Sequence, residues 1–178
     1  DRTLEISNRL GFQAMSVRDL SEATGISMGA LYAYIESKDK LLVATLQHMA
    51  DEYAAHWRGA LSKAGQEPAA RLAALVDADF DRAVCNRRKL AAWCAFWGEA
   101  RSRPTYQALC GARDEAYQST VVELCTSLIE AGGYALDPRQ AALAIDSMLE
   151  GLWLQLMMRE GLTREKAHKA ARAMVAAL

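Results

Sequence analysis

The chain has 178 residues, 52% of them hydrophobic and 7% aromatic, and a formal net charge of −1 at pH 7. This length suits one sizeable domain, or a small domain joined to a medium one. No stretch of 18 apolar residues occurs, so we expect no membrane span and no membrane partner, and the charge excludes a strongly basic nucleic-acid binder.

Abundant alanine, only three prolines and the lack of alternating strand patterns predict an all-α protein. The pattern of apolar residues, caps and breakers predicts about nine helices. Their expected ranges are 1–11, 17–24, 27–35, 37–64, 68–84, 87–101, 104–131, 138–160 and 163–178.

The stretch 16–42 has the pattern of two short helices, a tight turn and the start of a longer helix. Ser16, Ser27 and Ser37 are candidate N-caps, and Gly25 can adopt the left-handed conformation that ends a helix. Ile26 is expected to fill the space between the two short helices. A helix, a glycine-containing turn and a second short helix are typical of a helix-turn-helix, whose second helix usually enters the major groove of DNA.

The surface expected on this second helix consists of small residues, which suits close approach to a groove. The alternative to a DNA-binding motif is a helical hairpin packed within a hydrophobic core. Between residues 1 and 50, acidic residues slightly outnumber basic ones. We therefore expect helix N-termini and hydroxyl groups to hold part of the DNA backbone.

The same stretch resembles the DNA-binding domain of the TetR family of transcriptional regulators. The matching motifs are Gly11, Ser16-Val17-Arg18, Ala23-x-Gly25-Ile26-Ser27, Gly29-x-Leu31-Tyr32-x-Tyr34 and Ser37-Lys38-x-x-Leu41-Leu42. The family pattern usually has Phe at the positions of Ser7 and Ile35, which are packing positions. The residues expected to contact DNA are Ser16, Val17, Arg18, Ser27, Met28, Gly29, Ala30, Tyr32, Tyr34 and Lys38.

The resemblance also places Asp1 inside the first helix, so we expect a preceding segment, which in such regulators often carries a basic arm. It implies a three-helix DNA-binding domain at residues 1–45. A helical bundle for ligand binding and dimerisation is expected at residues 46–178.

Aromatic residues mark a candidate ligand site in this second domain. Trp93 and Trp97 lie four residues apart and Glu150 and Trp153 lie three apart, so each pair shares a helix face. Aromatic rings around a carboxylate can hold a cationic amine, although core or interface packing also explains them. The candidate ligand residues are Trp93, Trp97, Tyr106, Tyr117, Glu150 and Trp153.

The runs 89–97 and 145–154 are similar to the ligand domain of the BetI-type branch of the TetR family. That branch is named for a choline-responsive repressor, which implies a cationic amine such as choline as the effector. Glu150 stands where Asp is common in the branch. The branch also includes members with other effectors.

Wide apolar faces on the last two helices favour an interface. The resemblance implies a homodimer in which these helices from two subunits form a four-helix bundle. The residues expected at the interface are Ile145, Leu149, Leu152, Leu156, Ala167, Ala170, Ala171 and Met174.

We expect no metal, no cofactor and no enzymatic activity. Cys85, Cys94, Cys110 and Cys125 show no C-x-x-C spacing, and no phosphate-binding glycine loop is present. Paired acids such as Asp77 and Asp81 are common on solvated helix faces. The thiols are interpreted as reduced and structural, in a cytoplasmic protein.

The sequence therefore predicts a ligand-responsive DNA-binding transcriptional regulator, a repressor that a small molecule releases from its double-stranded DNA operator. The alternative is a helical small-molecule-binding or scaffold dimer without DNA binding. The slightly acidic balance of the N-terminal helices is the best support for that alternative.

Overall fold

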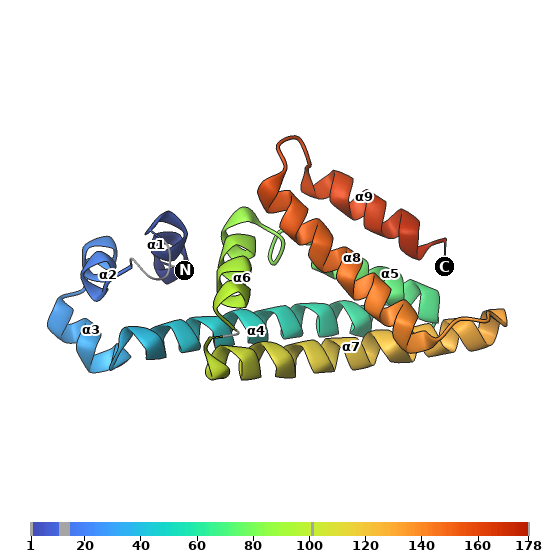
Figure 1. The fold of residues 1–178 in the computed structure, drawn as a ribbon, viewed down its shortest axis with the longest axis horizontal. Coiled ribbons are helices and arrows are strands. Elements are labelled where there is room, and N and C mark those ends of the chain that lie inside the picture. The colour runs from blue at the N-terminus through green and yellow to red at the C-terminus, as the bar shows by residue number, and fades with distance from the viewer. Residues whose placement is uncertain (1, 11–14, 101, 178) are drawn as a thin grey trace. The chain divides into compact units, whose positions relative to one another are not determined.

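The structure is a computed structural model that describes residues 2–10, 15–100 and 102–177, without the side chains of residues 7–10, 34 and 112–114. Within these ranges the chain forms helices and no strand, which confirms the all-α prediction (Figure 1). The helices are α1 Arg2–Leu10, α2 Val17–Thr24, α3 Met28–Ile35, α4 Lys38–Lys63, α5 Pro68–Asp79, α6 Arg87–Ala100, α7 Pro104–Gly132, α8 Pro138–Met158 and α9 Arg164–Val175. The predicted stop at Gly11 lies outside the described residues.

The predicted caps of the short helices are confirmed. The Ser16 hydroxyl accepts from the Asp19 backbone N–H at 3.3 Å, and an Asp19 carboxylate oxygen accepts from the Ser16 backbone N–H at 2.7 Å. This reciprocal capping box satisfies two amides that the first turn of α2 leaves without helical partners. Ser27 caps α3 through the Ala30 amide at 3.2 Å, and Gly25 ends α2 with a φ of 71°.

The described chain divides into two compact units. One comprises Asp1–Asp51 with Arg88–Cys110, and the other comprises Glu52–Arg87 with Gly111–Leu178. The first unit therefore holds α1–α3, the start of α4, α6 and the start of α7, and the second holds the rest. The boundary predicted at residue 45 separates the part expected to bind DNA from the part expected to bind ligand and dimerise. It stays a prediction.

In the first unit, α2 packs against both α1 and α3 around buried Leu4, Met15, Leu20 and Leu31. The prediction that Ile26 fills the space between α2 and α3 is wrong, because this side chain is 44% exposed. Polar groups hold the turn instead. The Ser21 hydroxyl donates to the Ile26 carbonyl at 2.7 Å, and the Ile26 amide donates to the Thr24 hydroxyl at 3.3 Å.

In the second unit, α9 packs against α5 and α8. Ala167 and Ala171 of α9 are fully buried, and their small side chains allow close approach to neighbouring helices. Helix α5 ends at Asp79, five residues before the predicted end at Val84. The reason is local: the Asp81 carboxylate accepts from the Ala83 amide at 2.7 Å, and the Asn86 amide donates to the Arg82 carbonyl at 3.1 Å, so side chains satisfy a turn here.

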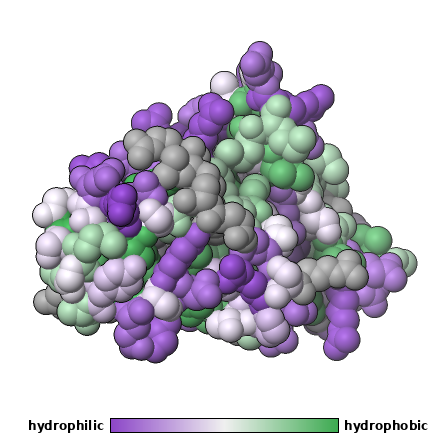
Figure 2. All heavy atoms as spheres, turned by 60° about the vertical axis from the view of Figure 1, so that its left-hand side comes forward, coloured by the Kyte–Doolittle hydropathy of each residue, from purple (hydrophilic) through white to green (hydrophobic). Residues whose placement is uncertain are grey.

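The surface is not uniform. On the face drawn in Figure 2, hydrophobic residues gather in patches between hydrophilic ones. The large hydrophobic residues exposed in the described chain are Ile26, Met28, Tyr32, Tyr134, Leu136, Leu143, Leu154, Met158 and Met174.

Candidate functional site

Helix α3 presents small residues and one aromatic ring to the surface. Ser27, Met28 and Gly29 are exposed, and the Tyr32 side chain is 51% exposed. Leu31 is buried and anchors the opposite side of the helix. A side chain added at Gly29 would meet no atom within 4 Å, so this face is open. The predicted DNA-contacting residues Ser27, Met28, Gly29 and Tyr32 are therefore accessible, and their contact with DNA stays a prediction.

At the start of α2, only some of the predicted DNA-contacting side chains are exposed. Ser16 and Arg18 are exposed, but the Val17 side chain is 8% exposed and packs inward. Val17 can therefore offer DNA only its backbone. Lys38 is half-buried at the start of α4, Ala30 is half-buried on α3, and the Tyr34 side chain lies outside the described residues.

An arginine joins several elements of the first unit near the start of α4. Arg103 donates to Asp39 at 2.8 Å and lies 2.9 Å from a Glu99 carboxylate oxygen. Its guanidinium also lies 5.3 Å from the ring centroid of Tyr106. The turn between α6 and α7 is thus tied to the first turn of α4, which follows the helix-turn-helix directly.

Three of the predicted ligand residues form part of an aromatic cluster in this same unit. The rings of Trp93 and Trp97 stack with centroids 6.2 Å apart, and Phe96 contacts Tyr106 edge-on at 5.2 Å. The Tyr106 hydroxyl is buried and has no hydrogen-bond partner among the described residues. Burial also raises the pKa of Tyr106 above its ordinary value, so this phenol is a neutral group that can donate to a ligand.

The second unit contains a buried carboxylate surrounded by aromatic rings. Asp79, at the end of α5, is 2% exposed. One of its carboxylate oxygens accepts from the Tyr53 hydroxyl of α4 at 2.6 Å, and the other accepts from the Tyr117 hydroxyl of α7 at 2.8 Å. The pKa of Tyr117 is raised well above its ordinary value, mainly by burial and then by the charge of Asp79. Tyr117 therefore stays protonated, and its hydroxyl donates to the carboxylate as the Tyr53 hydroxyl does.

Two further aromatic rings complete this group, which we call the Asp79 cluster: Asp79, Tyr53, Tyr117, Trp57 and Trp153. The Trp153 ring lies edge-on to Tyr53 at 5.8 Å, and the Trp57 ring lies edge-on to Tyr117 at 5.7 Å. The Trp57 indole N–H is buried without a hydrogen-bond partner among the described residues.

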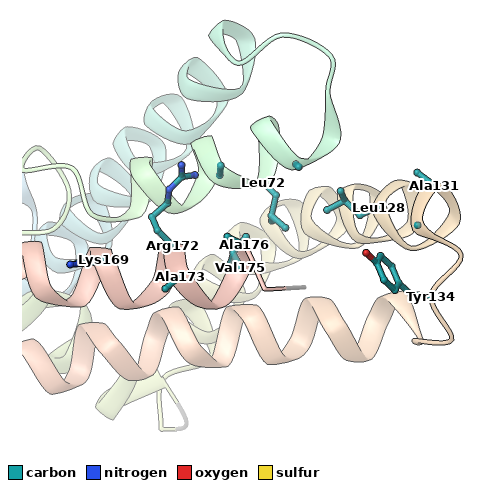
Figure 3. Close-up of a pocket in the computed structure, with 12 residues that line it drawn as sticks. Leu72, Leu128, Ala131, Tyr134, Lys169, Arg172, Ala173, Val175 and Ala176 are labelled. Carbon is teal, nitrogen blue, oxygen red and sulfur yellow. The ribbon is translucent and has the colours of Figure 1, made fainter.

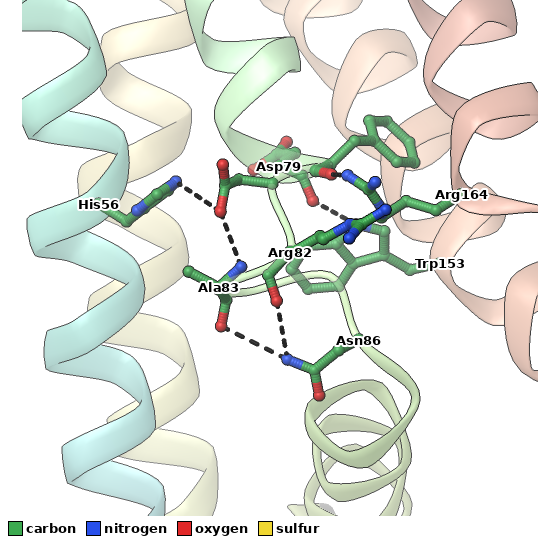
Figure 4. Close-up of polar contacts among 9 residues, drawn as sticks. His56, Asp79, Arg82, Ala83, Asn86, Trp153 and Arg164 are labelled. Carbon is green, nitrogen blue, oxygen red and sulfur yellow. Dashed lines mark hydrogen bonds and ion pairs between the residues drawn. The ribbon is translucent and has the colours of Figure 1, made fainter.

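The backbone at the end of α5 is bound by the last two helices. The Trp153 indole of α8 donates to the Asp79 carbonyl at 3.1 Å. Arg164 of α9 donates to the Phe80 carbonyl at 2.6 Å (Figure 4). These donors satisfy carbonyl groups that a helix end leaves without helical partners. Residues of four helices, α4, α7, α8 and α9, thus bind Asp79 or the following Phe80 at the end of α5.

The six predicted ligand residues do not form one site within either unit. Tyr117 and Trp153 belong to the Asp79 cluster, whereas Glu150 is exposed on α8. Trp93, Trp97 and Tyr106 belong to the other unit. The sequence reasoning missed Asp79, Tyr53 and Trp57. A usable signal existed, because Asp79 follows Leu72 and Leu75 at helical spacing and so continues the buried stripe of α5.

The predicted interface residues divide into two groups. Ile145, Leu149, Ala167 and Ala171 are buried within the subunit, where they pack against its own helices. Leu152 and Leu156 are half-buried, and Ala170 and Met174 are exposed. The exposed Leu143, Leu154 and Met158 of α8 were not in the prediction.

By length and composition alone, α8 could cross a membrane. One such helix is weak support for a span, because core helices of soluble proteins have the same properties.

Comparison with known proteins identifies the family. The C-terminal domain of BetI-type transcriptional repressors matches residues 68–178, and the tetR family of bacterial regulatory proteins matches residues 1–45. The HTH-type transcriptional regulator BetI of Burkholderia thailandensis is 29% identical over 158 residues, which cover 87% of this chain and 77% of that protein. BetI of Pseudomonas aeruginosa PAO1 is 28% identical over 162 residues, covering 86% and 76%.

Solved structures agree in fold. A protein described as a transcriptional regulator from Pseudomonas aeruginosa PAO1 superimposes with a TM-score of 0.84 at 28% identity, covering 98% of this chain and 85% of that one. A regulator from Saccharomonospora viridis, solved in complex with choline, gives a TM-score of 0.85 at 18% identity, covering 98% and 94%. The relatives are regulators rather than enzymes. Because the repressor family matches more than half of its residues, the chain belongs to the BetI-type branch of the TetR family of DNA-binding, ligand-responsive transcriptional regulators.

Proposed function

We propose that this regulator is a homodimeric repressor that leaves its DNA operator when a cationic amine, such as choline, binds at the Asp79 cluster. The observation that carries the effector class is the buried Asp79 carboxylate with four aromatic rings around it. Since it acts on chromosomal DNA, we propose a cytoplasmic location.

The chemistry of the cluster favours a cation. A buried negative charge is costly unless it is hydrogen-bonded and balanced by positive charge. Two of the hydrogen bonds to Asp79 come from the hydroxyls of Tyr53 and Tyr117. A quaternary ammonium group would add positive charge beside the carboxylate without needing a hydrogen bond. Aromatic faces would add about 0.5–2 kcal/mol of cation–π attraction each.

The Trp57 indole favours an effector that also carries an oxygen. Its buried N–H has no hydrogen-bond partner among the described residues, and such a group is costly to leave unsatisfied. A hydroxyl or carbonyl oxygen near the ammonium group would accept this hydrogen bond. Choline and betaine aldehyde both combine these features, and the choline complex of the Saccharomonospora viridis regulator is consistent with this effector class.

For the operator, we propose that Ser16, Arg18, Tyr34 and Lys38 bind phosphates, with the Val17 amide as a backbone donor. Ser27, Met28, Ala30 and Tyr32 would face bases or groove walls, and Gly29 would permit close approach. One short recognition helix cannot specify an operator, so two copies related by a two-fold axis would read half-sites about 34–36 Å apart.

For the dimer, we propose that the exposed apolar residues of the last two helices form the interface. Leu143, Leu154 and Met158 of α8 and Met174 of α9 are the largest of these. Leu152, Leu156 and Ala170 lie near Leu154, Met158 and Met174 in sequence. The four buried residues predicted at the interface would support these helices from inside the subunit.

An effector can shift the equilibrium between DNA-binding and released states only through different affinities for the two. Helix α4 contributes residues to both units, with the start of the helix beside α3 in sequence and Tyr53 in the Asp79 cluster. We propose that this helix transmits the change.

A mobility-shift assay on the DNA beside the gene, with and without choline, betaine aldehyde or a polyamine, tests this function. We expect a shifted band that the effector abolishes, together with heat of binding in calorimetry. Asp79→Asn should still shift the DNA but lose the response, whereas Asp77→Asn, an exposed acid of the same helix, should keep it. No DNA shift would favour the scaffold alternative, and no heat with any amine would contradict the effector class.

A further inference from the structure

A groove of about 760 Å³ lies in the second unit between α5, α7 and α9 (Figure 3). Leu72 of α5, Leu128 of α7 and Val175 of α9 provide its larger apolar side chains, and alanines provide most of the rest. Its volume falls within the range of small-molecule sites, about 300–1,000 Å³.

The charged residues of this groove are all basic among its described lining. Lys169 and Arg172 of α9 lie on the side of the groove that is away from Tyr134 (Figure 3). Two other grooves of the same unit differ in this respect. One is lined by Glu115 and Glu123 with Arg139, and the other by Asp77 and Asp81 with Lys63, so both mix acidic and basic residues.

Both cations can accept an additional anionic partner. Lys169 is exposed and has no ion pair within the part of the chain that the structure describes. Arg172 approaches Asp77 through Nε at 3.5 Å, and the same Asp77 oxygen lies 2.7 Å from His168. The two terminal amino groups of Arg172 stay available to donate in the paired geometry that suits a carboxylate.

The opposite end of the groove is aromatic. The Tyr134 ring lies over Gly132, so close that a Cβ added at Gly132 would fall 2.0 Å from a ring carbon. Glycine at the end of α7 therefore allows the ring to form this wall. The groove thus has a cationic end, an apolar middle and an aromatic end.

From this arrangement we propose that the groove binds an amphipathic carboxylate, with the carboxylate at Lys169 and Arg172 and an alkyl chain along Leu72 and Leu128 toward Tyr134. Such a ligand is opposite in charge to the amine proposed for the Asp79 cluster. The groove also uses a different side of α9 from Ala170 and Met174, because residues 169, 172 and 176 lie on one side of the helical wheel and 170 and 174 on another.

Calorimetry with monomeric octanoate, on the full chain, tests this site. We expect one octanoate per subunit, and much weaker binding of 1-octanol, which has the same chain without the charge. The double variant Lys169→Gln/Arg172→Gln should weaken octanoate binding about ten-fold or more, as expected for a lost charge-assisted contact. Lys63→Gln, which changes an exposed lysine of the separate groove lined by Asp77 and Asp81, should bind as the wild type does.

A steric variant separates charge from shape. Ala173→Trp, at an exposed position of the lining, should block octanoate while leaving the helical content unchanged. Saturating choline should leave octanoate binding unaltered, so failure of the amine proposal would not affect this one. The absence of heat with octanoate, equal binding of 1-octanol, or unchanged binding by the double variant would each overturn the proposal.

Discussion

Replacing Tyr117 with Phe tests the central hydrogen bond of the Asp79 cluster. The substitution removes one hydroxyl and leaves the buried ring in place, so it creates almost no cavity. It also leaves one Asp79 oxygen without its 2.8 Å hydrogen bond. A hydrogen bond to a charged group is worth about 1.5–3 kcal/mol.

The expected loss of unfolding free energy should appear as a lower melting temperature, Tm. A domain of about 150–250 residues loses about 2–4 °C per kcal/mol, so Tyr117→Phe should lower Tm by about 3–12 °C. Thermal unfolding followed by circular dichroism measures this, at one fixed protein concentration because dimerisation shifts Tm by mass action. Tyr134→Phe is the matched control, because that hydroxyl belongs to a 53% exposed residue and its loss should change stability by less than about 0.5 kcal/mol.

Tyr53→Phe extends the test to the other oxygen, whose hydrogen bond measures 2.6 Å. Since both phenols donate to one carboxylate, the double variant should deviate from additivity by at least about 0.5 kcal/mol. If the Tm of Tyr117→Phe lies within a degree of the wild-type Tm, the hydrogen bond from Tyr117 to Asp79 does not stabilise the fold, which would contradict this prediction.

Three further outcomes follow from other parts of the chain. Burial raises the pKa of Cys85 to about 12, so as the pH rises the thiol ionises in the unfolded chain before it does in the folded one. The free energy of unfolding should therefore fall between pH 9 and about pH 12. Cys85→Ala should reduce that fall when denaturant unfolding is measured as a function of pH. Gly25→Ala should cost about 1 kcal/mol because Gly25 has a φ of 71°, whereas Gly29→Ala should leave the fold intact yet weaken the mobility shift. Leu154→Lys should move the elution volume toward a monomer; an unchanged dimer would contradict the proposed interface.

Local signals in the sequence predicted most helix ends well. Ser16, Ser27 and Ser37 cap helices as expected, because a cap depends on residues within one turn of itself. Gly161 has a φ of 83° just after α8, although the helix ends at Met158 rather than at the predicted Glu160. The prediction that these helices belong to a DNA-binding regulator rested on the family motifs.

The Asp79 cluster could not be predicted in the same way. Asp79 lies between two other acids, Asp77 and Asp81, which are both exposed, and only its position on the helix turns it inward. Its partners Tyr53 and Tyr117 lie 26 and 38 residues away along the chain. Local periodicity does not identify such partners, because it gives the face of one helix and not the helices that pack against it.

The shared carboxylate at the end of α5 also constrains which amino-acid substitutions this protein can accept during evolution. Replacing Asp79 alone with a hydrophobic residue would remove the acceptor that both phenols share, and replacing either tyrosine alone would remove one donor to the carboxylate. A concerted change, with Asp79 becoming apolar and both Tyr53 and Tyr117 becoming Phe, removes these donors and their acceptor together. We therefore expect these three positions to covary among close relatives, with the acid and both phenols gained or lost together.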